Sequence, residues 1–117
     1  MPKILIVDDD RTTVKLLQTL LEMDGFEVVM AARGQAALEL AREAVPDVFL
    51  VDYHLADMAG VELVSLLRAE PMFSKTPIVM ASGLNMEEEA LKAGANKFLI
   101  KPFEPNKLAD LFNSMIG

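Results

Sequence analysis

Hydrophobic and polar residues alternate in blocks along the chain, and two apolar blocks end directly in acids. Residues 4–7 (ILIV) lead into three consecutive aspartates, and residues 48–51 (VFLV) lead into Asp52. A short, continuous apolar run bounded by turn signals is typical of a strand that is buried on both faces of a sheet. We therefore predict strands over residues 4–7 and 47–52, the second with Asp52 at its carboxyl end.

The remaining blocks predict three further strands and five helices. In five segments the apolar residues recur at helical spacing, and glycine or proline marks one end of each. Asn85 and Glu88 have the spacing of a capping box at the start of the fourth helix. Three predicted helices span residues 12–23, 34–44 and 60–69. The fourth runs from the Asn85 cap to Gly94, and the fifth begins at Pro105. The further strands span residues 26–31, 77–81 and 96–100.

This order is a strand followed by a helix, repeated five times, without a linker or an internal repeat. Alternation of this kind predicts the α/β class, with a five-stranded parallel sheet covered by helices on both faces and right-handed crossovers. A length of 117 residues suits one domain with a real core. We expect a single domain over residues 1–117.

Composition narrows the function classes. Apolar residues make up 52% of the chain, which indicates a globular protein, and the net charge of −7 argues against nonspecific nucleic-acid binding. No apolar run has the roughly 18 residues of a membrane span, and the amino terminus lacks the pattern of a signal peptide. The absence of cysteine excludes disulfides and thiolate metal sites. We expect a cytoplasmic protein without a direct nucleic-acid or membrane partner.

Polar residues close four of the five predicted strands. The carboxyl ends of parallel strands form the edge of the sheet where ligands bind in open α/β folds. Three clustered carboxylates repel one another, so they need either protons or a hard cation, and an oxygen-only ligand set favours Mg²⁺. These strand-end residues are Asp8, Asp9, Asp52, Ser82 and Lys101.

The lysine and the serine in this set indicate that the site binds phosphate as well as a metal ion. Lys101 is a point charge that suits a phosphate, and the Ser82 hydroxyl donates a hydrogen bond to one of its oxygens. Asp52 would then be a nucleophile that forms an aspartyl phosphate. The alternative is a purely structural salt-bridge network, which is disfavoured because buried ion pairs stabilise poorly and three acids face one lysine.

With these motifs the chain resembles a response-regulator receiver domain of two-component signalling, over essentially all 117 residues. Asp8-Asp9 match the acidic pair of the family, Asp52 its phosphoacceptor, Ser82-Gly83 its Ser/Thr step and Lys101-Pro102 its Lys-Pro signature. The resemblance implies a flavodoxin-like (βα)5 three-layer sandwich with strand order 2-1-3-4-5. It also implies a signalling phosphoacceptor that assists its own phosphotransfer and dephosphorylation, and not an enzyme.

The resemblance further assigns roles to individual residues. It implies that Asp9, Asp52 and the backbone carbonyl of His54 ligate Mg²⁺ directly, and that Asp8 acts through water. Ser82 and Phe98 would be the switch residues, and they would reshape the surface formed by the fourth helix, the fifth strand and the fifth helix. His54 and Leu84, each two residues beyond a site residue, would tune dephosphorylation.

The implied partners are a sensor histidine kinase or a histidine phosphotransfer protein, which would donate the phosphoryl group from phosphohistidine. The output would be a downstream protein target or an output domain that lies outside this chain. Two departures concern the loop after the acceptor. Ala56 stands where the family usually has proline, and Ala59 where it commonly has Asp or Asn, which puts the rigidity of this loop and the capping of the third helix in doubt.

Two alternatives remain open at the level of the sequence. Residues 8–12 (DDDRT) also fit the opening D-x-D-x-T motif of haloacid-dehalogenase-like phosphatases, with Asp8 as nucleophile and Asp10 as general acid. That interpretation lacks the required acidic motif after Lys101 and leaves Asp52 without a role. The second alternative is a receiver-like protein-binding module that is never phosphorylated, although such a module has no need of the complete set of charged site residues.

Overall fold

Strands and helices alternate along the whole chain, as the hydrophobic pattern predicts. The computed structural model describes residues 1–116, and they form five strands and five α-helices with a 3₁₀ turn before β4 and another before α5. The strands are β1 (Lys3–Val7), β2 (Glu27–Ala31), β3 (Val48–Asp52), β4 (Ile78–Ser82) and β5 (Lys97–Ile100). The helices are α1 (Arg11–Met23), α2 (Gly34–Ala44), α3 (Gly60–Ala69), α4 (Glu87–Ala93) and α5 (Leu108–Ile116).

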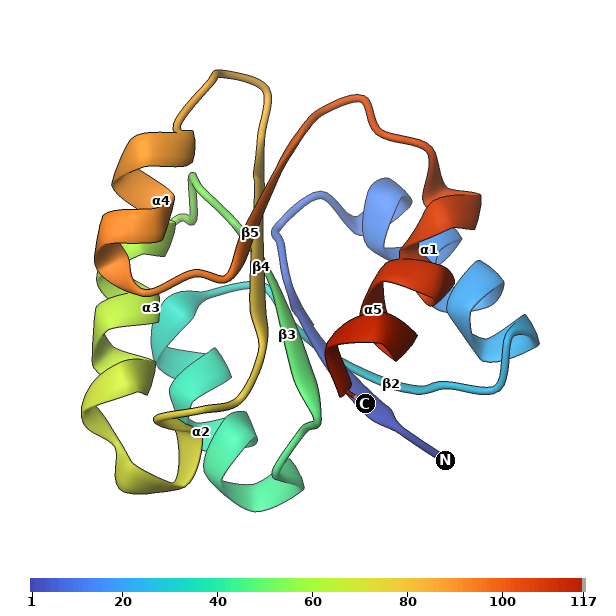
Figure 1. The fold of residues 1–117 in the computed structure, drawn as a ribbon, viewed down its shortest axis with the longest axis horizontal. Helices are drawn as coiled ribbons and strands as arrows, with labels where there is room; N and C mark the ends of the chain where they lie inside the picture. Colours follow the sequence, from blue (N-terminus) through green and yellow to red (C-terminus); the bar gives the residue numbers. More distant parts are fainter. Residues whose placement is uncertain (117) are drawn as a thin grey trace.

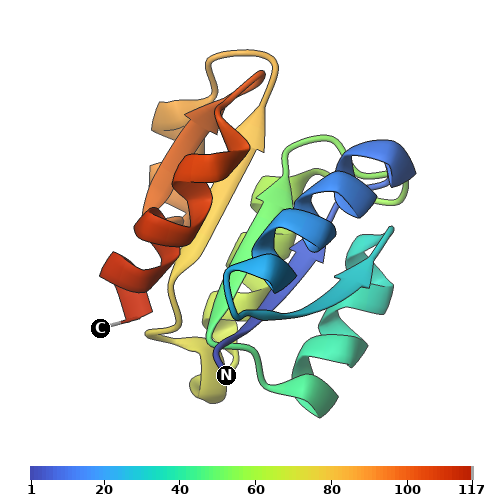
Figure 2. The ribbon, with the colours of Figure 1, turned by 90° about the vertical axis from the view of Figure 1, so that its right-hand side faces the viewer.

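The strands form one parallel sheet in the order β2-β1-β3-β4-β5, which confirms the flavodoxin-like topology. Helices α1 and α5 cover one face of the sheet, and α2, α3 and α4 cover the other (Figures 1 and 2). The winding reverses between β1 and β3, which are neighbours in the centre of the sheet. This is the switch point at which ligands bind in folds of this class.

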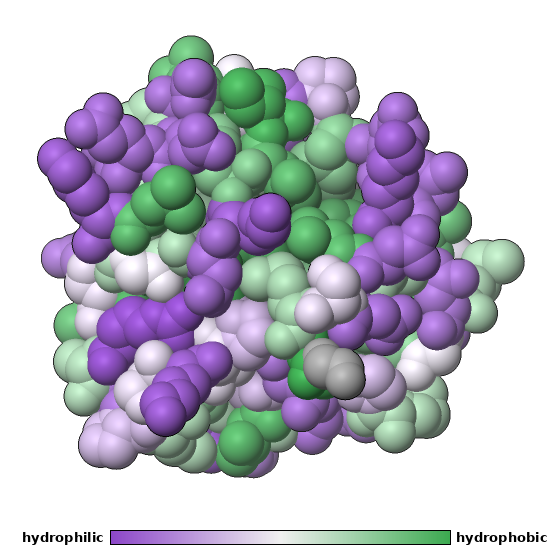
Figure 3. Space-filling model, in the orientation of Figure 1, coloured by the Kyte–Doolittle hydropathy of each residue, from purple (hydrophilic) through white to green (hydrophobic). Residues whose placement is uncertain are grey.

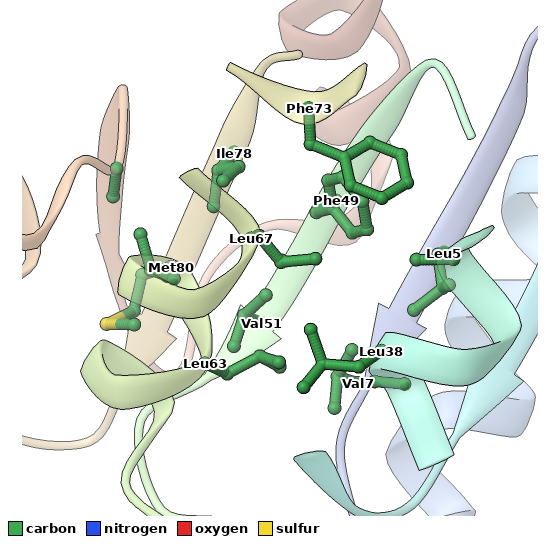
Figure 4. Packing of buried hydrophobic residues seen from close by; sticks show 14 of the residues in the cluster. Leu5, Val7, Leu38, Phe49, Val51, Leu63, Leu67, Phe73, Ile78 and Met80 are labelled. Carbon is green, nitrogen blue, oxygen red and sulfur yellow. The ribbon is translucent and has the colours of Figure 1, made fainter. Parts of the chain in front are cut away.

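The uninterrupted apolar runs of β1 and β3 are explained by burial on both faces. Successive strand residues point to opposite faces, so Phe49 and Val51 of β3 pack towards α2 and α3, whereas Val48 and Leu50 pack towards α1 and α5. All four side chains are buried. Figure 4 shows the first of these cores, in which the rings of Phe49 and Phe73 meet edge to face at 5.3 Å between centroids.

Side-chain capping accounts for two differences from the predicted boundaries. Helix α1 begins at Arg11 because the Asp10 carboxylate accepts hydrogen bonds from the backbone N–H groups of Thr12 (3.2 Å) and Thr13 (3.3 Å). The predicted capping box of α4 is wrong. Asn85 instead accepts from the N–H of Glu87 (3.3 Å) in a local turn, and the helix begins only at Glu87.

The last helix also begins later than its pattern predicts. Pro105 opens a 3₁₀ turn that ends at Lys107, and α5 proper begins at Leu108. Proline lacks an N–H and fixes φ, so it is compatible with either kind of helical first turn. None of the helices in residues 1–116 has the length and apolar character needed to cross a membrane.

Candidate functional site

The ends of β1, β3 and β5 bring charged side chains together at one edge of the sheet. One carboxylate oxygen from each of Asp8, Asp9 and Asp52 lies within 4.8 Å of the others. The Lys101 ammonium reaches into this group, with Nζ 3.0 Å from Oδ2 of Asp8 and 2.9 Å from Oδ1 of Asp52. Four of the five residues predicted from the strand ends, Asp8, Asp9, Asp52 and Lys101, therefore do meet, although they are far apart in the sequence.

Strand pairing explains this arrangement. Val7 pairs with Val51 across the β1–β3 switch point, so Asp8 and Asp52, each one residue further along, leave the sheet side by side. The N–H of Asp8 also bonds to the carbonyl of Ala31 (3.1 Å), which holds Asp8 against the end of β2. The Asp8 side chain is 7% exposed and that of Asp52 is 14% exposed, so both are held at the mouth of the buried sheet.

The charges at this edge are not balanced. Burial raises the pKa of Asp52, repulsion from Asp8 and Asp9 adds to the rise, and the hydrogen bond from Lys101 offsets only part of it. Burial by itself would lower the pKa of Lys101, but its bonds to Asp52 and Asp8 outweigh burial and raise this pKa. One ammonium faces three carboxylates, so the site attracts a further cation.

The donor set fits Mg²⁺. It offers carboxylate oxygens within 4.8 Å of one another, and the exposed Asp9 leaves the group open to water on one side. Mg²⁺ prefers oxygen ligands and keeps several waters when one or two carboxylates bind it. The imidazole of His54 is exposed and packs against the Tyr53 ring (4.8 Å between centroids), and it is not among the side chains that cluster at this edge.

The two residues predicted to switch lie on β4 and β5, next to this edge. Ser82 is buried, and its Oγ accepts a hydrogen bond from the N–H of Leu84 (3.2 Å). Phe98 is half-buried and packs against the core on the α2–α4 side of the sheet. Leu84 is 62% exposed in the loop before α4.

Comparison with known proteins agrees with this architecture. Residues 4–113 match the family model described as "Response regulator receiver domain". The chain belongs to this family. Receiver domains are signalling phosphoacceptors that bind Mg²⁺ at an acidic pocket, and they are generally not classed as enzymes. They interact with histidine kinases or phosphotransfer proteins and with output domains.

Two relatives match the receiver along almost their whole length. The polar-differentiation response regulator DivK of Brucella anthropi is 30% identical, with 100% of this chain and 98% of the relative covered. The chemotaxis protein CheY1 of Helicobacter pylori is 34% identical, with 98% and 97% covered. Other curated relatives are longer: the chain spans 52% of the phosphate regulon regulator PhoB of Rhizobium meliloti, at 34% identity.

Solved structures of receivers superimpose closely on this one. A putative response regulator from Chloroflexus aurantiacus has a TM-score of 0.92 at 35% identity, with 99% of this chain and 98% of that chain covered. The chemotaxis response regulator CheY4 of Vibrio cholerae has a TM-score of 0.92 at 32% identity, with 98% of both chains covered. The fold and the family assigned from the sequence are confirmed.

Asp10, the third of the three consecutive aspartates, has a structural role as the N-cap of α1. Asp10 accepts hydrogen bonds from Thr13, through both its hydroxyl (2.8 Å) and its N–H, and from the N–H of Thr12, and these bonds lower its pKa. A general acid needs a raised pKa. Asp10 is therefore unsuited to the role that the phosphatase interpretation gives it.

Sequence reasoning missed two contacts around the loop between β3 and α3. The Asp57 carboxylate accepts from the N–H groups of Gly34 (2.8 Å) and Gln35 (3.0 Å), and these bonds lower its pKa. The hydroxyl of Tyr53 donates to Glu89 of α4 (2.9 Å). A signal for the first contact exists, because the N-cap position of α2 is occupied by Arg33, which cannot cap the helix.

The raised pKa of Asp52 predicts a pH dependence in protein stripped of divalent cations. The folded state holds the Asp52 proton more tightly than the unfolded chain does, so the ionised carboxylate destabilises the fold at pH values above its folded pKa. This destabilisation decreases as the pH falls towards 3.8, the ordinary pKa of an aspartate side chain. The Asp52→Asn variant lacks the titration, so its Tm relative to wild type should be higher at about pH 7 than at about pH 4.

Thermal unfolding of the two proteins with a chelator at both pH values measures this difference. Asp10 and Asp57, whose pKa values are lowered, titrate in both proteins, so their effects cancel in the comparison. A Tm difference that is independent of pH, or that grows towards acid pH, would contradict the prediction.

Proposed function

We propose that this receiver accepts a phosphoryl group onto Asp52 from the phosphohistidine of a sensor kinase or a histidine phosphotransfer protein. The observation that carries the proposal is Lys101, whose ammonium bridges Asp8 and Asp52 within a cluster of three carboxylates. A cation fixed beside an acid that leads out of a central strand suits the transfer of an anionic group to that acid.

In the transfer, an oxygen of the Asp52 carboxylate attacks phosphorus, and the P–N bond to the donor imidazole breaks as the O–P bond forms. The electron pair of the broken bond leaves with the imidazole nitrogen. The transition state is loose, so the protein contributes mainly position and charge. Lys101, already within 3.0 Å of the acceptor carboxylate, would donate to a phosphoryl oxygen and offset its negative charge.

Mg²⁺ bound by Asp9, Asp52 and the carbonyl of His54, with Asp8 acting through water, would neutralise charge on the phosphoryl oxygens. Around the acceptor, this chain's own residues hold the neighbouring carboxylate of Asp8 in place. Asp8 Oδ1 accepts from the N–H of Asp10 (2.9 Å), and Asp8 Oδ2 accepts from Lys101, so both its oxygens have fixed partners. The carboxylate next to the acceptor is therefore already oriented when the phosphoryl group arrives.

The hydrogen bond from the Leu84 N–H to Ser82 Oγ supports a switching role for Ser82. If the hydroxyl turns towards a phosphoryl oxygen, this bond (3.2 Å) breaks and the loop before α4 is released. Phe98 on β5 pairs with Met80 of β4, two residues before Ser82, so a shift of β4 reaches it directly. The phosphate would favour one of two states by better contacts, which is a population shift.

The output surface proposed here is formed by α4, β5 and α5. The face of the molecule in Figure 3 alternates hydrophobic and hydrophilic areas. Leu84 of the loop before α4, Leu91 of α4 and Ile100 of β5 are 62%, 47% and 50% exposed. These side chains would contact the downstream target or an output domain. Leu84 and His54 are also proposed to tune dephosphorylation by controlling the access of water.

Incubation of the wild-type protein with acetyl phosphate tests the proposal. Intact mass should rise by one phosphoryl group in Mg²⁺, hydroxylamine should remove it, and peptide mapping should place it on Asp52. Replacing Mg²⁺ by EDTA should slow uptake by about 100-fold, because neutralisation of the transferred charge is lost. No uptake in Mg²⁺, together with no Mg²⁺ binding, would contradict the proposal and favour the non-phosphorylated binding module.

A further inference from the structure

Two positions of the loop between β3 and α3 (residues 53–59) lack side chains that would restrain its shape. It has alanine at positions 56 and 59, where proline and a capping side chain would stiffen it, and Ala59 is the N-cap of α3 without a side-chain cap bond. The same loop carries His54, whose carbonyl is part of the proposed Mg²⁺ site. A contact from outside the loop can supply the side-chain restraint that these two positions lack.

Asp57 supplies a fixed point at the far side of the loop. Its two carboxylate oxygens accept from the N–H groups of Gly34 (2.8 Å) and Gln35 (3.0 Å), the first residues of α2. The carboxylate also faces the positive end of the α2 dipole, where a negative charge is stabilised. The contact joins segments 22 and 23 residues apart, so it fastens the loop to a different element.

A second contact lies beside the first. Met58 packs directly on Gly34, so that a Cβ at position 34 would overlap the sulfur and the terminal methyl of Met58. The absence of a side chain at Gly34 therefore lets the loop approach α2 closely. Together, Asp57 and Met58 hold the loop against the first turn of α2 from two neighbouring positions.

Hydrogen bonds within the loop connect this anchor to His54. The N–H of Leu55 donates to the carbonyl of Met58 (3.2 Å), and His54 and Ala59 form an isolated antiparallel bridge. The loop is thus a small closed turn with His54 at its base and Asp57 on its far side. A displacement of Asp57 from α2 moves a unit that includes His54.

We propose that Asp57 is a positioning residue for metal binding and phosphoryl transfer. By fastening the loop to α2, it keeps the His54 carbonyl where Mg²⁺ needs it, although Asp57 is outside the acidic cluster itself. The inference rests on the proposed function. It assigns to Asp57 the restraint that Ala56 and Ala59 do not provide.

Mg²⁺ titration of Asp57→Ala, Asp57→Asn and Asp47→Ala tests this role. Tyr53, the chain's one tyrosine in the absence of tryptophan, follows Asp52 directly and provides the fluorescence signal. Asp47 is the matched control, because its carboxylate also accepts from a backbone N–H, that of Lys3 (2.7 Å), before the opposite end of β3. Thermal unfolding is measured alongside for each protein.

We expect Asp57→Ala to raise the Kd for Mg²⁺ by about tenfold, as the loss of groups that orient metal ligands does. Asp57→Asn should fall in between, since its amide oxygen still accepts from one of the two N–H groups. Asp47→Ala should leave the Kd unchanged even where it lowers Tm. The slower phosphoryl uptake of Asp57→Ala should recover at saturating Mg²⁺, which a general loss of structure would not allow.

Each other outcome has a definite meaning. An unchanged Kd in Asp57→Ala, or equal changes in Asp57→Ala and Asp47→Ala, overturns the positioning role while the proposed function stands. Failure of the wild-type protein to bind Mg²⁺ removes the proposed function and this inference with it. If Asp57→Ala does not fold, Asp57→Asn decides, and a wild-type Kd in that variant overturns the inference.

Discussion

The Asp52→Asn protein is expected to take up no phosphoryl group from acetyl phosphate under conditions that fully label the wild type. The amide is a poor nucleophile and leaves no carboxylate at the end of β3, while its shape and its hydrogen-bond acceptor for Lys101 are retained. Burial disfavours the ionised form of Asp52 and raises its pKa. Because the asparagine carries no charge, the variant should stay folded. Intact mass spectrometry and circular dichroism measure uptake and folding on the same sample.

Asp8→Asn is the control that separates this proposal from a phosphatase-like mechanism. Asp8 bonds to Lys101 and would act on the metal only through water, so its loss should slow uptake by about 10- to 100-fold without abolishing it. In a phosphatase-like protein the pattern would be reversed, with Asp8 as the essential nucleophile. A stable aspartyl phosphate in the Asp52→Asn protein would refute the assignment of Asp52 as acceptor.

The fold was predictable where burial alone decides the local structure. Residues 48–51 are apolar without interruption because the strand is covered on both faces, and such a run has few other interpretations. Helices α2 and α3 have the predicted bounds, 34–44 and 60–69. Their limits coincide with glycine at the start and with a proline shortly after the end, which are strong local signals.

Predictions failed where two local solutions compete. Asn85 was expected to cap α4 together with Glu88, yet it closes a turn that ends at Glu87, the first residue of the helix, by accepting from the N–H of Glu87. Both arrangements satisfy the same side-chain oxygen, so the sequence does not distinguish between them. Asp10 is the converse case: it was weighed as a chemical group, and its hydrogen bonds to Thr12 and Thr13 make it a helix cap.

The residues of the candidate site also fall into two groups, those that the sequence pattern predicts and those that it does not. Asp8, Asp52 and Lys101 were brought together by reasoning from strand ends, since the carboxyl ends of parallel strands share one edge of the sheet. Asp57 and Tyr53 were not connected to their partners, because those partners lie 22 to 36 residues away on α2 and α4. Only packing determines which helix faces the loop, and no local pattern encodes it.

Tyr53 and Asp57 give the loop after the acceptor two external attachments on opposite sides. Tyr53 bonds to Glu89 of α4, and Asp57 bonds to the start of α2. The first attachment leads to the proposed output surface, and the second leads to a part of the molecule outside that surface. The loop that follows Asp52 is therefore connected both to α4 of that surface and to α2 outside it.

Gly60→Ala is expected to destabilise the receiver by about 2–3 kcal/mol and to lower Tm by about 10 °C. A Cβ at position 60 would overlap the backbone carbonyl oxygen of Asp52 and lie 3.0 Å from Cα of Tyr53. Neither backbone atom can move aside as the end of a flexible side chain can. The first turn of α3 must then retreat from the end of β3, or the acceptor must move. Urea and thermal unfolding measure the stability, and labelling with acetyl phosphate, expected to slow at least tenfold, measures the site.

Gly83→Ala is the matched control for Gly60→Ala. Gly83 follows Ser82 at the same edge of the sheet, but no atom lies within 4 Å of a Cβ placed there. Its substitution should shift the free energy of unfolding by less than about 0.5 kcal/mol.

If both variants unfold at the wild-type urea concentration, the close approach of Gly60 to Asp52 does not constrain the molecule. If Gly60→Ala loses stability but labels at the wild-type rate, α3 has retreated while Asp52 kept its place. The position of the acceptor then depends on β3 and Lys101 and not on its contact with α3.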